Sequence, residues 1–573
     1  MKKIFVIILS VFALVGCTLE EKVISYSEPS TYYQTVPQCI TGLNGCYIPL
    51  RSLYGNADYF EACETSADLL YHTSASYYES HCDYTQSMPR AGSSIWNNGY
   101  LGVMRCNAMF AAIERAPLSE EEKKPLFAEA EILRAFYYYI LTINFGNVPY
   151  YFEEVTDANN DRIAQLPRMD AVELRDILMT NLEHWLLEEN ALPLIKTYAP
   201  ENEYRIGAMV GLVIGGKLAL WNKDWDRAIK FFEPVIALYG CPDTEGGFTP
   251  NQALLGYKLT DVMFRVRYAD ESIFELPAYA KDNGLKVTHS LASRCSPFRR
   301  STIVEGGDLA GDDDDIVVED DTKELGKKDD MYDGVRIPEM GKEMRTTDPY
   351  RVSKYMYNTL MPYNSKDKRR AVYDPNKSTV DELVEIEGGG GWLAWGYSGW
   401  TSEENMETVP RHWCWFATTK EKTGRPLPGD KFWCPGMKYN QDSNNAKIFR
   451  LAHVLFDMAE AKMRMGLWEE ANGYLNASRV RAGLDKLELY SEEEFMEELQ
   501  KESARELFGE FTRRHNLVRW GIYYDQVMKY SDDTKLKDNL REAPCREYYP
   551  IPDQQIVLSN YNLDNNEYTK WGI

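Results

Sequence analysis

The stretch AEAEILRAFYYYILTINFGNVPY, residues 128–150, decides the fold. Gly146 can adopt the left-handed conformation that ends a helix, and Pro149 prevents the helix from continuing. Three consecutive tyrosines at 137–139 wrap around the predicted helix and indicate neighbours on more than one side. The apolar residues that recur at helical spacing and predict a buried face are Ile132, Leu133, Phe136, Ile140 and Ile143.

The first 16 residues have the pattern of a signal peptide. Lys2 and Lys3 precede an apolar run at 4–15, which is shorter than the about 20 residues that a permanent membrane span needs. The run leads into Leu-Val-Gly-Cys at 14–17, which resembles the lipobox of bacterial lipoproteins. We therefore predict that Cys17 carries the lipid and that the mature chain is anchored to a membrane rather than embedded in it. The alternative is a plain secretory signal followed by a chance cysteine.

Composition limits the class of protein. The chain has 573 residues, of which 557 remain after the first 16, and 64 Lys plus Arg face 88 Asp plus Glu for a net charge of −24. This acidic balance argues against a nucleic-acid partner. Aromatic residues make up 13% of the chain, enough to fill a core and leave some for a surface. The 11 cysteines include no CxxC pair, so we expect mostly buried free thiols.

Two distant segments share one pattern. Residues 217–240 and 462–483 each predict a helix, a tight turn with Trp-acid-x-Ala, and a second helix that stops at Gly240 or Gly483. Paired helices with a small residue at a fixed place are typical of tetratricopeptide-type repeats.

The predicted helices are interrupted by a long segment of different character. Helical patterns dominate 98–145, 170–240 and 446–531, whereas 241–445 is rich in glycine and loop signals. Binding residues are concentrated on loops that a rigid scaffold positions. We divide the chain into a signal peptide at 1–16, a helical part at 17–240, a loop-rich ligand-binding insertion at 241–445 and a helical part with a C-terminal tail at 446–573.

A set of motifs runs along the mature chain at 64–68 (ETSAD), 96–107 (WNNGYLGVMRCN), 130–149, 450–461, 476–484, 517–521 and 550–568. In these motifs and their order, the whole mature chain resembles the SusD/RagB family of outer-membrane glycan-binding lipoproteins. Three positions depart from the family pattern: His453 replaces the usual Glu, Asn516 replaces Asp, and Phe511 stands where Gly follows Glu510.

The resemblance implies a mostly α fold, in which four tetratricopeptide-like helix pairs form a scaffold and a long loop-rich insertion carries the ligand site. It implies a protein that caps a TonB-dependent, SusC-like outer-membrane transporter and holds an oligosaccharide until it is imported. Such a protein catalyses no reaction. Glu20 and Glu21 follow the anchor cysteine, as in the signal that sends some lipoproteins to the cell surface.

Motifs for catalysis or cofactors are weak. Residues 211–218 (GLVIGGKL) lack the Ser or Thr of a phosphate-binding loop and lie in a helical pattern. Asp157, Asn159 and Asp161 begin like a calcium loop, but Arg162 replaces the required glycine, and the acidic run at 312–315 is typical of a solvated loop. We predict no catalytic residues, no metal and no cofactor, and the sequence leaves calcium binding open.

Sugar binding needs exposed aromatic rings, because the apolar face of a pyranose stacks on a ring while polar side chains bond to its hydroxyls. Rings in glycine-rich or Ser/Thr-rich loops are therefore the candidates, and four other tryptophans, Trp96, Trp225, Trp468 and Trp520, are expected in the core. The candidate ligand-binding residues are Tyr71, Tyr77, Tyr78, Trp392, Trp395, Tyr397, Trp400, Trp413 and Trp415.

Three functions remain open at this point. The first is a surface lipoprotein that binds a glycan and hands it to the transporter. The second is a helical-repeat scaffold for a peptide or protein, and the third is a lipid-anchored glycoside hydrolase. A ring-lined pocket favours the first, an open groove lined by Asn, Lys and Arg the second, and two facing carboxyl groups in a cleft the third.

Overall fold

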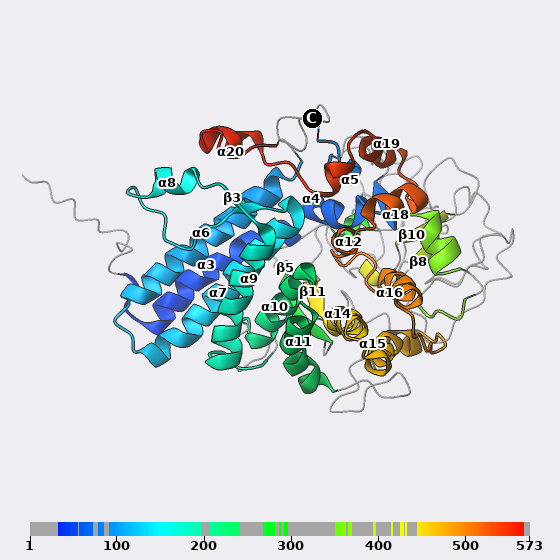
Figure 1. The fold of residues 1–573 in the computed structure, drawn as a ribbon, viewed down its shortest axis with the longest axis horizontal. Coiled ribbons are helices and arrows are strands. Elements are labelled where there is room, and N and C mark those ends of the chain that lie inside the picture. The colour runs from blue at the N-terminus through cyan, green and yellow to red at the C-terminus, as the bar shows by residue number, and fades with distance from the viewer. Residues whose placement is uncertain are drawn as a thin grey trace, which may run out of the picture.

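The structure is a computed structural model, and helices dominate it (Figure 1). It describes residues 32–55, 57–72, 78–84, 91–195, 205–240, 267–269, 271–280, 286–287, 291–295, 350–362, 365–369, 393–396, 414–415, 425–428, 430–432 and 444–565.

The stretch around residues 128–150 forms the C-terminal half of α7 (Glu120–Phe145) and the turn after it. Ser119 begins the helix with a capping box, in which its hydroxyl accepts from the Glu122 N–H and Glu122 accepts from the Ser119 N–H. The helix stops at Gly146, whose φ of +68° favours glycine. The predicted helix end is therefore confirmed, and the predicted apolar face is buried.

The tyrosines of α7 bind its neighbours. The Tyr137 hydroxyl donates to the Cys46 carbonyl of α3 (Val36–Tyr54) and accepts from the Leu50 N–H at 3.1 Å. The Tyr137 ring reaches α3 by passing over Gly102 of α6 (Ser93–Arg115), where a Cβ would lie 2.3 Å from the ring. The Tyr138 hydroxyl donates to the Tyr151 carbonyl at 2.8 Å. Helices α3, α6 and α7 thus form one packed layer (Figure 1).

Both copies of the sequence repeat are helix pairs. α10 (Ala208–Asn222) packs on α11 (Trp225–Tyr239), and α14 (Leu451–Arg464) packs on α15 (Trp468–Arg481). Ala228 and Ala471, the alanines of the shared pattern, are fully buried. The two pairs meet where α11 contacts α14, and α9 (Ala171–Glu183) joins α10 to α7.

The mostly α, tetratricopeptide-like fold is therefore confirmed. Residues 211–218 lie inside α10, which is incompatible with a phosphate-binding loop.

Short strands connect segments that are far apart in the sequence. β4 (Ser272–Leu276) pairs antiparallel with β11 (Ala446–Arg450), with Leu276 opposite Ala446, so these two positions near the ends of the predicted insertion lie together. β2 (Val148–Pro149) pairs with β3 (Arg168–Met169), and β5 (Tyr279–Ala280) with β6 (Lys286–Val287). The remaining elements away from the site are α4 (Ala57–Phe60), α5 (Tyr78–His81), α8 (Asn160–Ala164), η2 (His184–Glu188), α12 (Leu291–Arg294), α18 (Tyr523–Tyr530), α19 (Thr534–Glu542), η10 (Pro544–Glu547) and α20 (Asp553–Leu558).

The tryptophans expected in the core differ in burial. Trp96 is buried as expected, but Trp225, Trp468 and Trp520 pack against the core while keeping part of the ring exposed. The half-buried Trp520 ring donates its indole N–H to the buried Glu460 carboxylate at 3.0 Å.

Within the described ranges, six cysteines are buried free thiols, as expected: Cys39, Cys46, Cys63, Cys82, Cys106 and Cys295. None of the helices described combines the length and apolarity that a membrane span requires.

Two Gly→Ala changes should have opposite effects on stability, because only one of them lies where α6 and α7 approach closely. Gly102→Ala should lower the free energy of unfolding by about 1–3 kcal/mol, because the new Cβ collides with the Tyr137 ring. Gly45→Ala in α3 meets nothing within 4 Å and should raise it by up to about 1 kcal/mol through helix propensity. Urea unfolding of both variants measures this, and equal effects would contradict the packing described.

Candidate functional site

A short segment at residues 506–513, between α16 (Glu492–Glu506) and α17 (Arg513–Arg519), binds several distant parts of the chain. Arg450 donates to the Glu510 carboxylate at 2.7 Å and to that of Glu506 at 2.9 Å. Arg369 donates to Glu502 at 2.8 Å and to Glu506 at 2.9 Å. All five side chains are fully buried. We call residues 506–513 the anchor segment.

A buried ammonium group completes this cluster. Lys431 of the 3₁₀ turn η9 (Asp430–Phe432) donates to the Glu510 carboxylate and to the Glu506 carbonyl, both at 2.8 Å. Burial alone would raise the pKa of Glu502 and Glu510, but the surrounding guanidinium and ammonium groups lower it to about 2. Burial lowers the pKa of Lys431 to about 8 although Glu510 opposes the shift. The carboxylates are therefore ionised at neutral pH and hold their partners firmly.

The ETSAD motif at 64–68 also binds the anchor segment. Glu64, in the π-helix η1 (Glu61–Thr65), accepts from the N–H groups of Gly509 and Thr512 at 3.1 and 2.8 Å. Asp68 forms two bonds of 2.7 Å with the Arg513 guanidinium. Burial raises the pKa of Glu64 to about 7, against the lowering effect of these N–H donors. The motif that resembles the family pattern thus connects the start of the fold to its end.

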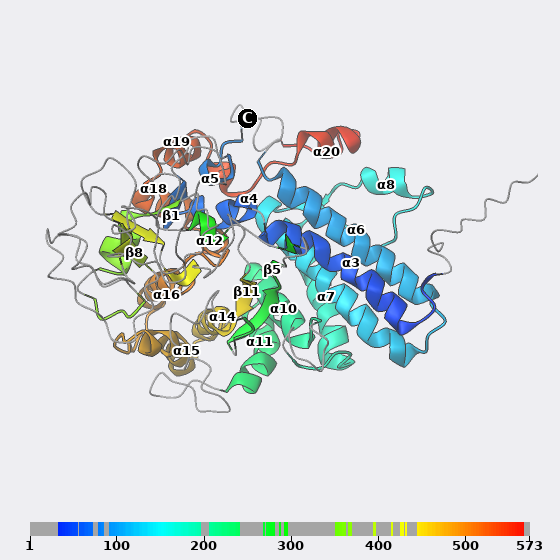
Figure 2. The same ribbon diagram turned by 180° about the vertical axis from the view of Figure 1, so that it is seen from behind.

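Strands next to these contacts carry three of the predicted rings. Tyr71 lies in β1 (Leu70–His72), which pairs antiparallel with β7 (Tyr350–Val352). β10 (Arg425–Pro428) lies against β7 and pairs with β8 (Leu393–Gly396), which contains Trp395. β9 (Cys414–Trp415), which contains Trp415, pairs parallel with β8. Three stretches far apart in sequence therefore meet here (Figure 2). We call strands β1, β7, β8, β9 and β10 the ring surface.

The other predicted residues are placed differently. Tyr78 begins α5 and packs half-buried against the core, which suits a structural role better than ligand stacking. Cys17, Tyr77, Trp392, Tyr397, Trp400 and Trp413 lie outside the described residues.

The stretch around residues 157–161, which begins like a calcium loop, forms local hydrogen bonds. The Asn159 side chain accepts from the Thr156 N–H at 2.7 Å and donates to the Glu154 carbonyl. Across the described residues, no group of three or more His, Cys, Asp or Glu side chains could hold a metal ion.

Two tyrosines near Tyr71 were missed by sequence reasoning. They lie in the π-helix η6 (Tyr355–Leu360), where Tyr355 stacks on Tyr530 with ring centroids 3.8 Å apart. Burial raises the pKa of the half-buried Tyr357 to about 12, with contributions from Asp532 and Tyr71. π-helical turns are frequent at functional sites, but neither glycine nor Ser/Thr enrichment marks 355–360 in the sequence.

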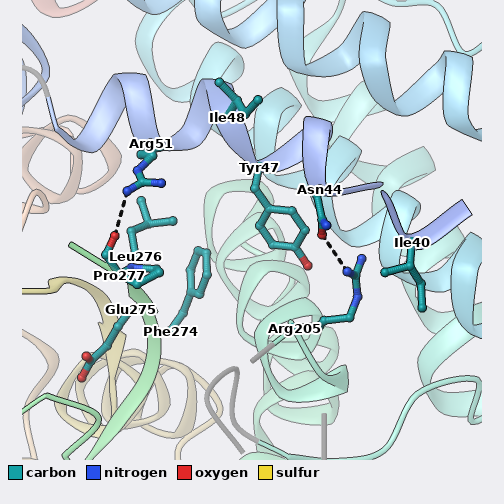
Figure 3. A pocket seen from close by; sticks show the side chains of 10 residues that line it. All are labelled: Ile40, Asn44, Tyr47, Ile48, Arg51, Arg205, Phe274, Glu275, Leu276 and Pro277. Carbon is teal, nitrogen blue, oxygen red and sulfur yellow. Dashed lines mark hydrogen bonds between the residues drawn. The ribbon is translucent and has the colours of Figure 1, made fainter. Parts of the chain in front are cut away.

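A separate cavity of about 340 Å³ lies between α3 and β4 (Figure 3). Tyr47 projects into its middle, with Phe274 on one side and Arg205 on the other (Figure 3). Its described lining is Ile40, Asn44, Tyr47, Ile48, Arg51, Arg205, Phe274, Glu275, Leu276 and Pro277.

The polar groups of this cavity already have partners in the protein. Arg205 donates to Asn44 at 2.8 Å, and Arg51 donates to the Pro277 carbonyl at 3.0 Å. Glu275, the carboxylate among the described lining residues, points away from the cavity and binds Lys447 at 2.6 Å. The described lining therefore lacks the two facing carboxyl groups that a hydrolase needs. It combines rings with Asn and Arg, so it does not separate the glycan and peptide hypotheses.

Comparisons with known proteins agree with the motifs. The SusD family model matches residues 431–569, and a model described as "Starch-binding associating with outer membrane" matches residues 28–169. The two matched regions are SusD-like, and the resemblance to the SusD/RagB family predicted from the motifs is confirmed.

Individual relatives match nearly all of the chain or a part of it. SusD-like protein P25 from Formosa agariphila is 22% identical over 592 residues, covering 99% of each chain. The starch-binding protein SusD of Bacteroides thetaiotaomicron is 35% identical over 123 residues, 21% of each chain. The structure of surface glycan-binding protein A from Bacteroides thetaiotaomicron in complex with laminarihexaose matches with a TM-score of 0.61 and 18% identity, covering 93% of this chain and 99% of that one. The family thus includes glycan-binding proteins.

The buried carboxyl groups predict a stability maximum near pH 5. Glu61 and Glu64 have folded pKa values of about 7, raised by burial, so the stability they contribute is complete below their unfolded value near 4.5 and is lost as the pH rises through 7. Glu502 and Glu510 have folded pKa values of about 2, so their contribution is complete above 4.5 and is lost as the pH falls toward 2.

Urea unfolding at pH 7.5, 5 and 3 measures this balance. The unfolding free energy should be highest at pH 5, and Glu64→Gln should reduce the difference between pH 7.5 and pH 5. Glu122→Gln, at the exposed start of α7, is the control and should leave that difference unchanged. A Glu64→Gln protein with the wild-type pH dependence would contradict the assignment.

Proposed function

We propose that this protein is a lipid-anchored lipoprotein on the outer-membrane surface, which captures an oligosaccharide and delivers it to a TonB-dependent, SusC-like transporter. The observation that carries the proposal is the match of 93% of the chain to a surface glycan-binding protein in complex with laminarihexaose. The motif that resembles a lipobox supports Cys17 as the anchor, and the family description supports an outer-membrane location.

The ring surface is the proposed binding place. Tyr71, Trp395 and Trp415 lie on strands that meet there, and Tyr357 adds a half-buried ring beside Tyr71. Flat rings stack on the apolar face of a pyranose, and rings on several strands could contact successive sugars of one chain. The predicted rings at 392, 397, 400 and 413 lie outside the described residues and remain candidates from the sequence.

The proposal includes binding without cleavage. Capture followed by handover requires only that the glycan be held and released, and a glycosidase would require two carboxyl groups about 5 to 10 Å apart across the sugar. One carboxylate cluster among the described residues consists of Glu502, Glu506 and Glu510, which are fully buried and paired with cations. Those groups have a structural role and no access to a sugar.

Calorimetric titration of the protein lacking residues 1–17, against a panel of polysaccharides and host glycans with an assay for released reducing ends, tests this function. We expect binding without product release. Changing Trp392, Trp395 and Trp400 together to Ala should weaken binding at least tenfold, because stacking on each ring contributes about 0.5–1.5 kcal/mol beyond burial.

The same titration distinguishes the alternatives. Tyr47→Ala, in the cavity between α3 and β4, is the control and should leave affinity unchanged. Release of reducing ends would contradict binding without cleavage. Absence of binding across the panel would favour a scaffold for a peptide or protein.

A further inference from the structure

The ring surface is assembled from stretches that lie hundreds of residues apart. Tyr71 belongs to β1 near the start of the chain, whereas Trp395 and Trp415 belong to the middle. A ligand that contacts both groups requires them to be held at a fixed relative position, since each freely moving ring would lose entropy on binding. Both groups are connected, through different side chains, to the anchor segment at 506–513.

The first connection holds β1. Glu64 accepts three N–H groups of the anchor segment, from Gly509, Thr512 and Arg513, at 2.8 to 3.2 Å. Asp68 pairs with the Arg513 guanidinium, and its buried carboxylate also accepts from Gln526 at 2.9 Å. Tyr71 lies three positions after Asp68, a distance of about 10 Å in extended chain. The position of the Tyr71 backbone is therefore set by these bonds.

The second connection holds the sheet of β10, β8 and β9. Lys431 lies three residues after β10 and seats its ammonium between the Glu510 carboxylate and the Glu506 carbonyl. The next residue, Phe432, packs on Gly509, where a Cβ would lie 2.1 Å from the ring. Gly509 also has a φ of +76°, so this position needs glycine for two reasons. The Phe432 ring is buried and lies edge-on to Phe60, 6.4 Å away.

Charge makes the second connection specific. Lys431 is fully buried, and an ammonium at such a place is costly unless it is paired and hydrogen-bonded. If β10 moved away, the buried ion pair between the Lys431 ammonium and the Glu510 carboxylate would be lost. The strand is therefore held in one position rather than in a range of similar ones.

We propose that Lys431 and Asp68 are positioning residues, which place β10–β8–β9 and β1 in fixed register on the anchor segment so that rings from separate stretches contact one oligosaccharide. This inference rests on the proposed glycan-binding function. It assigns the residues no contact with the sugar, and their effect is on the arrangement of the strands that carry the rings.

The test compares Lys431→Met with Lys447→Met in the full mature chain. Lys447 is a matched control, because it is equally buried and pairs with a buried carboxylate, Glu275, at 2.6 Å, but it belongs to β11 of the scaffold. Amide hydrogen exchange is measured by mass spectrometry over β8, β10 and the scaffold helices α7 and α10. Affinity is measured by calorimetry with laminarihexaose and with the glycan that the wild-type protein binds most tightly in the panel.

Lys431→Met should raise amide exchange in β8 and β10 at least tenfold, leave α7 and α10 unchanged, and weaken glycan binding at least tenfold. Lys447→Met should neither raise amide exchange in β8 and β10 nor weaken glycan binding. Asp68→Asn is a second variant, which should raise exchange selectively in β1 and serves the same test if Lys431→Met does not fold.

Unchanged amide exchange in β8 and β10, or an equal rise in both lysine variants, would contradict the proposal that Lys431 attaches these strands to the anchor segment. Raised exchange with wild-type affinity would overturn the positioning role. If the wild-type protein binds no glycan, the proposed function fails by itself, and the exchange comparison still decides whether Lys431 holds the strands.

Discussion

The requirement that buried charges be paired determines how this chain is assembled. Glu506 and Glu510 occupy one short segment without access to water, and their partners Arg450, Arg369 and Lys431 come from three separate parts of the sequence. Replacing such pairs with apolar side chains can leave stability unchanged or raise it, so their value lies in specifying one arrangement. Each cation that joins the cluster fixes the path of the segment that carries it. The helical scaffold and the strands of the ring surface are joined at this place.

Much of the scaffold could be predicted because its signals are local. The apolar spacing around Phe136 and the stop at Gly146 are properties of adjacent residues, and the structure confirms both. The repeated Trp-acid-x-Ala pattern likewise predicts two helix pairs, because Ala228 and Ala471 leave room for a close neighbour. Family resemblance added the order of the motifs, and the Glu64–Asp68 motif proved to be the group that binds the anchor segment.

The site could be predicted only in part because its parts meet through long-range contacts. Tyr71 and Trp395 were selected as exposed rings, but nothing in the sequence indicates that β1 and β8 belong to one surface. Tyr357 and the cavity around Tyr47 were missed for the same reason. Three tryptophans expected in the core are half-buried, since helical periodicity gives the direction of a side chain but not how much of a large ring its neighbours cover.

Two departures from the family pattern have physical explanations. Phe511 has a φ of +61°, a conformation that glycine adopts without strain, and its ring packs 5.1 Å from that of Tyr54. Ring contacts offset the backbone strain there. His453 accepts from the Arg450 N–H, and burial lowers its pKa to about 3, so it is neutral. A glutamate at 453 would place another carboxylate next to Glu510, and the two negative charges would repel each other. The neutral imidazole of His453 avoids this repulsion.

We propose that a glycan binds to the ring surface and that the scaffold serves to hold that surface. The most direct measurement is a hydrogen-exchange footprint of the intact mature protein with and without a bound oligosaccharide. A glycan bound to the ring surface should protect amides in β1, β8 and β9 and leave exchange around Tyr47 and Arg205 unchanged. Protection confined to the cavity between α3 and β4 would contradict it and would move the binding site to the scaffold.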